Sequence, residues 1–268
     1  MTATYELLEM LPQDVADRLA AGNDIAVVPV WSIEQHGPHL LLGTDSYFAQ
    51  AVAREIGRLS GAAVLPPIPF SWVGCTNAFS GGVGVRESVF IGYLRAVVKG
   101  LWRAGFRRIV VYNCHGGNWA ALNRFPHDVL LEDGIPVMTV YGFANCQEAV
   151  DVERKAGGGE ATGLAGGLRL LGREDLVKKV VDNTLKAVAE FGDRPKVLFE
   201  PKAARESRRL GAVGHDYSHE CYHVQPDSGV NADAGAEAAT RIAAHIITCF
   251  DALGRYVRRL IDEGVAET

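Results

Sequence analysis

The chain has few features of secreted, membrane-bound or disulfide-stabilised proteins. Its five cysteines are widely scattered and form no Cys-x-x-Cys pair, so neither a disulfide framework nor a thiolate zinc site is indicated. No apolar run approaches the roughly eighteen residues of a membrane-spanning helix. The first residues, Met1 to Glu6, show no basic segment followed by an apolar one. We therefore expect a cytoplasmic protein without a membrane partner.

Clusters of basic residues are also missing. The net charge is −5, and the largest Lys/Arg groups are pairs such as Arg208-Arg209 and Arg258-Arg259. A nucleic-acid surface needs a concentrated basic patch. The glycine-rich stretch 81–84 is not followed by Lys-Ser/Thr, so it does not match a phosphate-binding loop. We expect a small-molecule substrate and no nucleic-acid partner.

The apolar pattern indicates a single α/β domain over residues 1–268. With 48% hydrophobic residues the chain can bury one substantial core, and no linker-like stretch divides it. Short apolar runs alternate with stretches of helical periodicity, which is typical of βαβ units and a parallel sheet. The predicted strands are Ile25–Val30, Ala63–Leu65, Ile109–Tyr112 and Pro136–Tyr141, and the predicted helices are 46–59, 87–104, 119–132 and a last long one near Ala234–Ile261.

Ionisable side chains directly follow the first predicted strand. Glu34 and His36 belong to the motif EQHGPH at residues 34–39, and in an extended chain they point to the same side. Thr44 is a suitable N-cap for the next helix, which places Asp45 in its first turn, facing the strand end. Unpaired ionisable groups at a core edge are costly, and a divalent metal would compensate. The alternative is a capping carboxylate, a core histidine and a surface glutamate.

A second motif follows the predicted strand that ends at Tyr112. The sequence NCHGGN at residues 113–118 leads into the helix that begins at Trp119, and His115 is the metal-ligand candidate within it. In open α/β sheets, ligand sites lie beyond the carboxyl ends of the strands. We therefore expect His115 near Glu34 and His36.

A third segment, GGGE at residues 157–160, places Glu160 at the start of a predicted helix. Its alternative role is a carboxylate that interacts with the helix dipole. Together with the residues above it completes a set of nitrogen and oxygen donors. Such a set is sufficient for two metals if one carboxylate bridges them. The five candidate metal ligands are Glu34, His36, Asp45, His115 and Glu160.

The motifs EQHGPH, GTD, N-x-H-G-G-N and a Gly-Glu pair at a helix start, in this order over about residues 25–170, resemble the creatininase (creatinine amidohydrolase) family. The resemblance implies a three-layer α/β/α sandwich with a mostly parallel sheet. It also implies a homo-oligomer, often a hexamer, and a hydrolase with two divalent ions of zinc, manganese or iron. In that family pattern Glu34, Asp45 and His115 would hold one ion. The other would be held by His36, Asp45 and Glu160, with Asp45 as the bridge.

Two positions depart from the family pattern. Members commonly have His-Ala-Gly-Glu where this chain has GGGE, so Gly157 replaces a histidine that is thought to move protons. Gly117 stands where true creatininases have a glutamate, two residues after the histidine. Both departures argue against creatinine as the substrate.

Three functions agree with these residues. The leading hypothesis is hydrolysis of a small cyclic amide or a related C–N bond, with Glu34 and Asp45 in catalysis. The alternative is hydrolytic opening of a C–C bond in a cyclic polyol ketone such as 3-dehydro-scyllo-inosose. Expelling an amine requires an acid near the nitrogen more strictly than expelling a metal-bound enolate does, so the missing histidine suits this alternative. The third is a metal-holding binding protein without turnover, which the presence of Glu34, Asp45 and His115 disfavours.

Residues near the motifs are candidates for substrate contact. Trp72 and Phe79 lie on a long loop, where they are expected to line the pocket or to pack beneath the loop. His39 and Asn118 are expected to contact the substrate or to orient the ligands, with a role in capping or turns as the alternative.

The segment 214–223 carries three histidines at intervals of four residues. We expect His219 or His223 to supply the proton transfer that is missing at Gly157. Oligomer contacts and an ordinary surface position are the alternatives.

Overall fold

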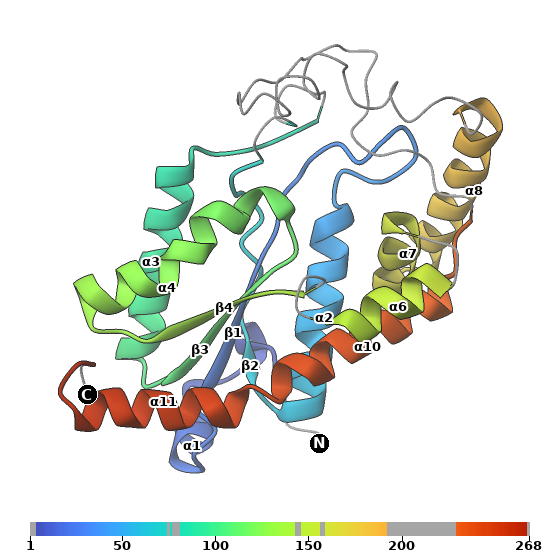
Figure 1. Cartoon of the computed structure of the whole chain (residues 1–268). Coiled ribbons are helices and arrows are strands. Elements are labelled where there is room, and N and C mark those ends of the chain that lie inside the picture. The colour runs from blue at the N-terminus through green and yellow to red at the C-terminus, as the bar shows by residue number, and fades with distance from the viewer. Residues whose placement is uncertain are drawn as a thin grey trace.

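A four-stranded, fully parallel sheet lies between two groups of helices (Figure 1). The computed structural model describes residues 4–73, 76, 81–142, 146–155, 159–191 and 229–266. The expected α/β fold with a parallel sheet is confirmed, and the strands lie within one or two residues of their predicted bounds. They are β1 (Ile25–Val30), β2 (Ala63–Val64), β3 (Arg108–Asn113) and β4 (Val137–Tyr141).

The order of the strands determines where a ligand can bind. The sheet has the order β2-β1-β3-β4, so the chain moves one way from β1 to β2 and the other way from β2 to β3. Helix α2 (Thr44–Ser60) covers one face, and α3 (Glu87–Arg103) and α4 (Trp119–Asp133) cover the other (Figure 1). The connections therefore diverge between the carboxyl ends of β1 and β3, which is the topological switch point where such sheets bind ligands.

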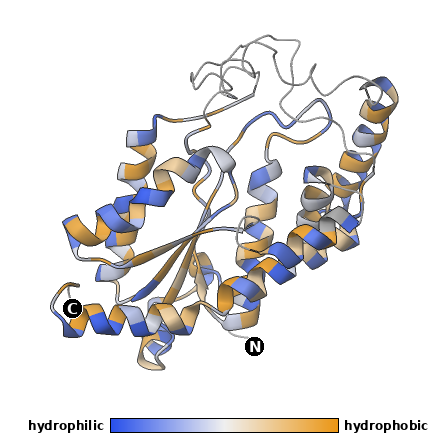
Figure 2. Ribbon diagram, in the orientation of Figure 1, coloured by the Kyte–Doolittle hydropathy of each residue, from blue (hydrophilic) through white to orange (hydrophobic). Residues whose placement is uncertain are grey.

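Both faces of the central strands are buried. All six residues of β1 are buried, as are five of the six in β3, and Figure 2 shows the sheet as mainly hydrophobic. Such strands read as continuous apolar runs because helices cover both faces. The strands are in register at their ends, where Val30 pairs with Asn113 and Asn113 pairs with Tyr141. Side chains that follow these strands therefore lie at the same edge of the sheet.

Two predicted helix boundaries are wrong. Helix α2 begins at Thr44 with Gly43 as its N-cap, because the Thr44 hydroxyl donates to the Leu41 carbonyl (2.7 Å) and not to its own helix. The predicted long C-terminal helix is two helices. The chain tightens after α10, where Thr248 N donates to His245 O (3.2 Å) and Cys249 N to Ile246 O (3.0 Å), and α11 leaves in a new direction (Figure 1).

The remaining helices complete the two outer layers and the ends of the molecule. They are the 3-10 turns η1 (Leu7–Glu9) and η3 (Gly116–Asn118), and α1 (Pro12–Ala20), α6 (Gln147–Lys155), α7 (Glu160–Leu170), α8 (Glu174–Phe191), α10 (Ala232–Ile247) and α11 (Phe250–Asp262).

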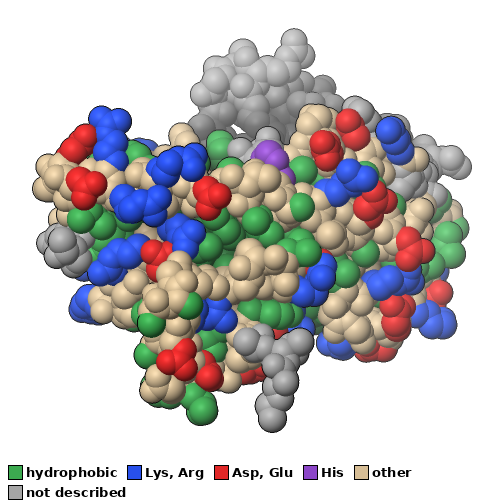
Figure 3. Space-filling model, turned by 90° about the horizontal axis from the view of Figure 1, so that it is seen from below, with side chains coloured by type: hydrophobic (Ala, Val, Ile, Leu, Met, Phe, Trp, Pro, Cys, Tyr) green, Lys and Arg blue, Asp and Glu red, His purple; other side chains and the backbone are tan. Residues whose placement is uncertain are grey.

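Charged side chains of both signs are interspersed over the face seen in Figure 3. Several of them form ion pairs, for example Arg241 with Glu237 (2.6 Å) and Lys99 with Asp133 (2.7 Å). A surface of mixed sign creates no extended field of one charge. Across the described ranges, no helix combines the length and the apolar character that a bilayer crossing requires.

Helices α7 and α10 cross in direct backbone contact. A Cβ at Gly166 would lie 2.1 Å from the carbonyl carbon of Gly235, and a Cβ at Gly235 would lie 2.0 Å from Thr162 O. The Asn231 backbone N–H also donates to the Thr162 hydroxyl (3.1 Å). Since Glu160 is the first residue of α7, this contact determines where its carboxylate lies.

Gly166→Ala should therefore destabilise the protein. The methyl group meets backbone that cannot rotate away, and overpacking of this kind costs about 1–3 kcal/mol or more. The matched control is Gly100→Ala in α3, where nothing lies within 4 Å of the added Cβ and the higher helix propensity of alanine is a gain of up to about 1 kcal/mol. Urea unfolding measures both, and equal stability of the two variants would contradict the close crossing.

Candidate metal centre

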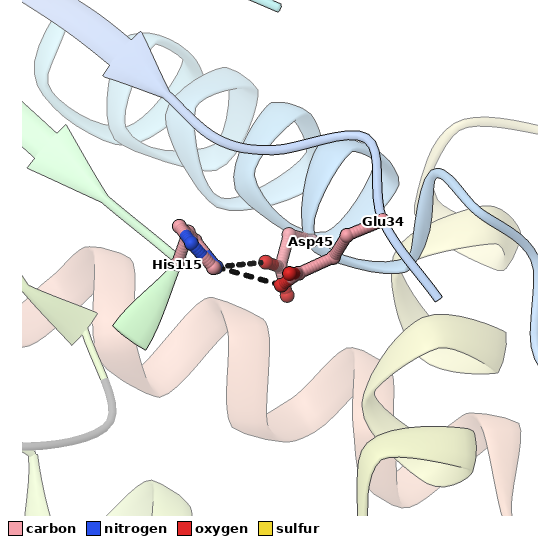
Figure 4. A group of neighbouring side chains, drawn as sticks. All are labelled: Glu34, Asp45 and His115. Atoms are coloured by element: carbon pink, nitrogen blue, oxygen red, sulfur yellow. Dashed lines mark hydrogen bonds and ion pairs between the residues drawn. The ribbon is translucent and has the colours of Figure 1, made fainter. Parts of the chain in front are cut away.

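Three ligand-type side chains from three elements meet at the β1/β3 switch point. Glu34 comes from the extended segment after β1, Asp45 from the first turn of α2, and His115 from the end of β3 (Figure 4). His115 Nδ1 lies 2.8 Å from Glu34 Oε1 and 3.1 Å from Asp45 Oδ2. One ligand atom of each residue lies within 4.8 Å of the others. Chain segments far apart in sequence thus converge on one space.

Asp45 lies between two imidazoles. Its Oδ2 faces His115 Nδ1, while its Oδ1 is 3.2 Å from His36 Nε2. His36 Nε2 is also 3.8 Å from Glu34 Oε1, as expected for two side chains on the same side of an extended segment. A carboxylate that presents one oxygen to each of two imidazoles has the arrangement of a bridging ligand.

Glu160 lies at the edge of this group. It is exposed at the start of α7, as predicted, and it is outside the close set of three. Its charge nevertheless contributes to raising the pKa of His36. The structure therefore brings four of the five candidate ligands into direct contact and places the fifth within electrostatic range.

Backbone carbonyls orient both imidazoles. His115 Nε2 lies 3.0 Å from Trp72 O, and His36 Nδ1 lies 3.2 Å from Glu34 O. A carbonyl oxygen can only accept, so the ring nitrogen beside it must carry the hydrogen and donate. This outer contact is typical of histidines that bind metals. It leaves Nδ1 of His115 and Nε2 of His36 to face the carboxylates.

Two hydroxyl groups that the sequence analysis missed support the carboxylates. Ser32 Oγ lies 2.8 Å from Asp45 Oδ2 and 3.2 Å from Glu34 Oε1, and the Thr76 hydroxyl donates to Glu34 Oε2. Ser32 could have been found because Ser32, Glu34 and His36 alternate in one extended segment. Thr76 has no comparable signal, since its loop is brought to the site only by the fold.

The carboxylates change the protonation of both histidines. Burial lowers the pKa of His36, but the hydrogen bond and charge of Asp45, followed by Glu160 and Glu34, outweigh it and raise the pKa to about 9. For His115, burial is again outweighed, here by Asp45 and Glu34, and the pKa rises to about 10. Burial raises the pKa of Asp45. The hydrogen bonds and charges of His115 and His36 outweigh burial and hold this pKa below its usual value. The metal-free group is therefore a network of ion pairs at pH 7.

Asn118 and His39 are both buried. Asn118 is fully buried, and its amide donates to Asn113 Oδ1 (3.2 Å), so it stabilises the turn after β3 as in the alternative role. Asn113 in turn donates to His115 O (2.7 Å). His39 is 1% exposed, and burial followed by the charge of His36 lowers its pKa to about 4. Within the described part of the chain, neither ring nitrogen of His39 has a hydrogen-bond partner.

The other predicted pocket residues have different outcomes. Trp72 is 38% exposed, and its backbone carbonyl orients His115, so its loop does reach the site. Phe79, His219, His223 and Gly157 lie outside the described residues.

Comparison with known proteins identifies the family. The family model described as "Creatininase: Creatinine amidohydrolase" matches residues 9–248. The chain belongs to the creatininase family. The matched range contains all five candidate metal ligands and both departures noted in the sequence.

Curated relatives are similar over part of the chain. A 3-dehydro-scyllo-inosose hydrolase of Thermotoga maritima is 34% identical over 98 residues, which is 35% of this chain and 30% of the relative. A mycofactocin precursor peptide peptidase of Mycolicibacterium smegmatis is 39% identical over 108 residues, which is 37% of this chain and 42% of the relative. The chain thus spans less than half the length of these relatives.

Solved creatininases share the fold. A creatininase variant with one tryptophan replaced by phenylalanine superimposes with a TM-score of 0.71 at 19% identity, covering 95% of this chain and 99% of the other. Two further structures, each 19% identical, are described as a manganese creatininase and as a mutant creatininase of Zn-Zn type. Members of this fold thus bind zinc or manganese.

Gly117→Ala should disrupt the centre. A Cβ at position 117 would lie 2.3 Å from His115 Nε2, so the ring must leave its contact with Trp72 O. Loss of such an orienting contact typically lowers metal affinity 10- to 100-fold. The matched control is Gly116→Ala, whose Cβ meets only Tyr141 Oη, at 3.5 Å. Zinc titration measures both variants, and an unchanged affinity in Gly117→Ala would contradict this position of His115.

Metal binding should release protons at neutral pH. With pKa values of about 9 and about 10, His36 and His115 are both protonated at pH 7, and a metal must displace these protons. Apparent affinity should therefore rise as the pH rises toward 9. In the metal-free protein, the ion pairs of the protonated histidines stabilise the folded state. This contribution to the free energy of unfolding is fully present below pH 6.5 and is lost as the pH rises through about 9 to 10.

Calorimetric titration of zinc in two buffers with different ionisation enthalpies measures this release. The difference in observed heat at pH 7 should correspond to about two protons per protein when both histidines bind metal. Identical heats in both buffers, together with an affinity that does not change with pH, would show that the histidines are neutral before metal binds.

Proposed function

We propose that this protein is a two-metal hydrolase that opens a small cyclic amide or a related C–N bond. The observation that carries the proposal is the position of Asp45, whose two oxygens each face a different imidazole while Glu34 contacts one of them. Membership of the creatininase family supports the same chemistry. We further propose a homo-oligomer, since members of the family are often hexamers, and a cytoplasmic location.

The donor set fits divalent ions. Imidazole and carboxylate groups suit zinc, manganese and iron alike. In the proposed arrangement Glu34, Asp45 and His115 hold one ion, and His36, Asp45 and Glu160 hold the other. When bound, such ions lower the pKa of water from 15.7 toward about 7 and polarise a carbonyl group.

The residues of the chain prepare the site for this chemistry. The Trp72 and Glu34 carbonyls hold each imidazole in one tautomer, with the free nitrogen facing inward. Ser32 keeps the Glu34 and Asp45 carboxylates next to each other. His219 and His223 remain the candidates for proton transfer to the leaving nitrogen.

Position 117 supports a substrate other than creatinine. A glutamate here would begin with a Cβ only 2.3 Å from His115 Nε2, so this chain cannot carry it without moving that ring. Glu160, whose charge acts on His36, is the carboxylate that we propose for the second ion. The peptidase relative, which by name acts on a peptide, supports a C–N bond as the target.

The second candidate is hydrolytic opening of a cyclic polyol ketone. It is favoured by the similarity to the inosose hydrolase of Thermotoga maritima, at 34% identity over 35% of this chain. Absence of histidine at position 157 also suits it, because an enolate leaves with less need for an acid than an amine does.

Asp45→Asn should abolish both metal binding and turnover. The amide supplies only one oxygen and no charge, so it cannot bridge: one ion loses this ligand and the other keeps only a neutral one. Removing several kcal/mol of metal-derived stabilisation corresponds to roughly 10³-fold or more in rate. The matched control is Asp182→Asn, an exposed carboxylate on α8 that pairs with Lys178.

The measurement combines metal analysis with a hydrolysis screen of hydantoin, dihydrouracil, creatinine and an inosose. Chelation should remove activity, and zinc, manganese or iron should restore it. The proposal would be contradicted if Asp45→Asn kept the metal content and turnover of Asp182→Asn. Activity on the inosose alone would select the second candidate.

A further inference from the structure

Tyr141 lies beside the metal centre, although no motif singled it out. It is the last residue of β4 and pairs in register with Asn113, two residues before His115. Its hydroxyl lies over the backbone that follows His115, because a Cβ at Gly116 would be 3.5 Å from Tyr141 Oη.

The surroundings of the hydroxyl favour a hydrogen-bond donor. Burial raises the pKa of Tyr141 well above its ordinary value, and the charges of Cys114, Asp45, Glu160 and Glu34 raise it further. All three carboxylates of the proposed centre therefore act on this phenol. A phenol that stays neutral can donate to an oxygen that gains negative charge.

Trp119 extends the same wall of the site toward solvent. It begins α4, four residues after His115, and its ring centroid lies 5.8 Å from that of Tyr141 at an interplanar angle of 47°. The indole is 47% exposed. An aromatic side chain that is half-exposed beside a polar centre offers a flat apolar surface at a short distance from a hydroxyl donor.

We propose that Tyr141 donates a hydrogen bond to the carbonyl oxygen of the substrate as that oxygen gains charge, and that Trp119 contacts the face of the substrate ring. The inference rests on the proposed function and narrows its substrate to a flat ring that carries a carbonyl group. Tyr141 would then be a catalytic residue and Trp119 a specificity residue.

The chemical balance requires no co-reactant besides water. Oxygen from water bonds to the carbonyl carbon, the C–N bond breaks, and the nitrogen takes the proton released from that water. Tyr141 keeps its own proton throughout, because its role is to stabilise the charged oxygen. Removal of one donor of this type typically lowers kcat 10²- to 10³-fold.

The test compares Tyr141→Phe and Trp119→Ala in the zinc-loaded enzyme with hydantoin as the probe. Tyr256→Phe is the matched control, since it removes an exposed tyrosine hydroxyl on α11, a helix that packs against Arg108 at the start of β3. We expect Tyr141→Phe to lower kcat at least 10²-fold with KM within threefold and unchanged zinc content. Trp119→Ala should raise KM at least tenfold with little change in kcat.

Other results would overturn the inference. Turnover of Tyr141→Phe within twofold of Tyr256→Phe would exclude the donor role, and loss of zinc in Tyr141→Phe would make the residue a support of the centre only. An unchanged KM in Trp119→Ala would remove the ring contact.

Failure of the proposed function is separable from failure of this inference. If the zinc-loaded parent does not hydrolyse hydantoin, the proposed activity on that ring fails, and calorimetric binding of hydantoin becomes the measurement. Binding that is weakened at least tenfold in Trp119→Ala and not in Tyr256→Phe would still support the ring contact. No binding to the parent, or equal binding to the variants, would overturn it.

Discussion

The structure depends most on one partly buried carboxylate that lies between two imidazoles. Asp45 presents one oxygen to His36 and the other to His115, and Ser32 donates to the same group. Bringing such charges together at a core edge is costly unless each has a partner of opposite charge. In the metal-free protein, protonated histidines provide that charge. Divalent ions would replace those protons, because the same nitrogen and oxygen atoms would be their ligands.

The fold positions this carboxylate through parallel strands and close helix contacts. β1 and β3 are adjacent, in register and buried on both faces, so Glu34 and His115 leave the sheet at the same edge. α2 returns over one face with Asp45 in its first turn. The glycine contact between α7 and α10 positions the helix that begins at Glu160, whose charge acts on His36. Stability of the framework and geometry of the centre are therefore linked.

Much of this arrangement could be predicted from the sequence because its signals are local. Continuous apolar runs identified the buried strands, and alternation along the chain placed Glu34 beside His36. Asn118 was predicted to contact the substrate or to orient the ligands, and only the fold shows that its amide donates within the turn after β3. Thr76 and Tyr141 were missed for a related reason. Their side chains reach the site from a loop and a strand whose positions depend on long-range pairing.

The central claim is that Asp45 bridges two ions, and anomalous X-ray scattering from crystals grown with zinc tests it most directly. The account predicts two anomalous peaks, one on each side of the Asp45 carboxylate. The first should be bounded by Glu34 and His115, and the second by His36 and Glu160. A zinc peak that does not touch Asp45, or a fully ordered centre that binds no zinc, would contradict it.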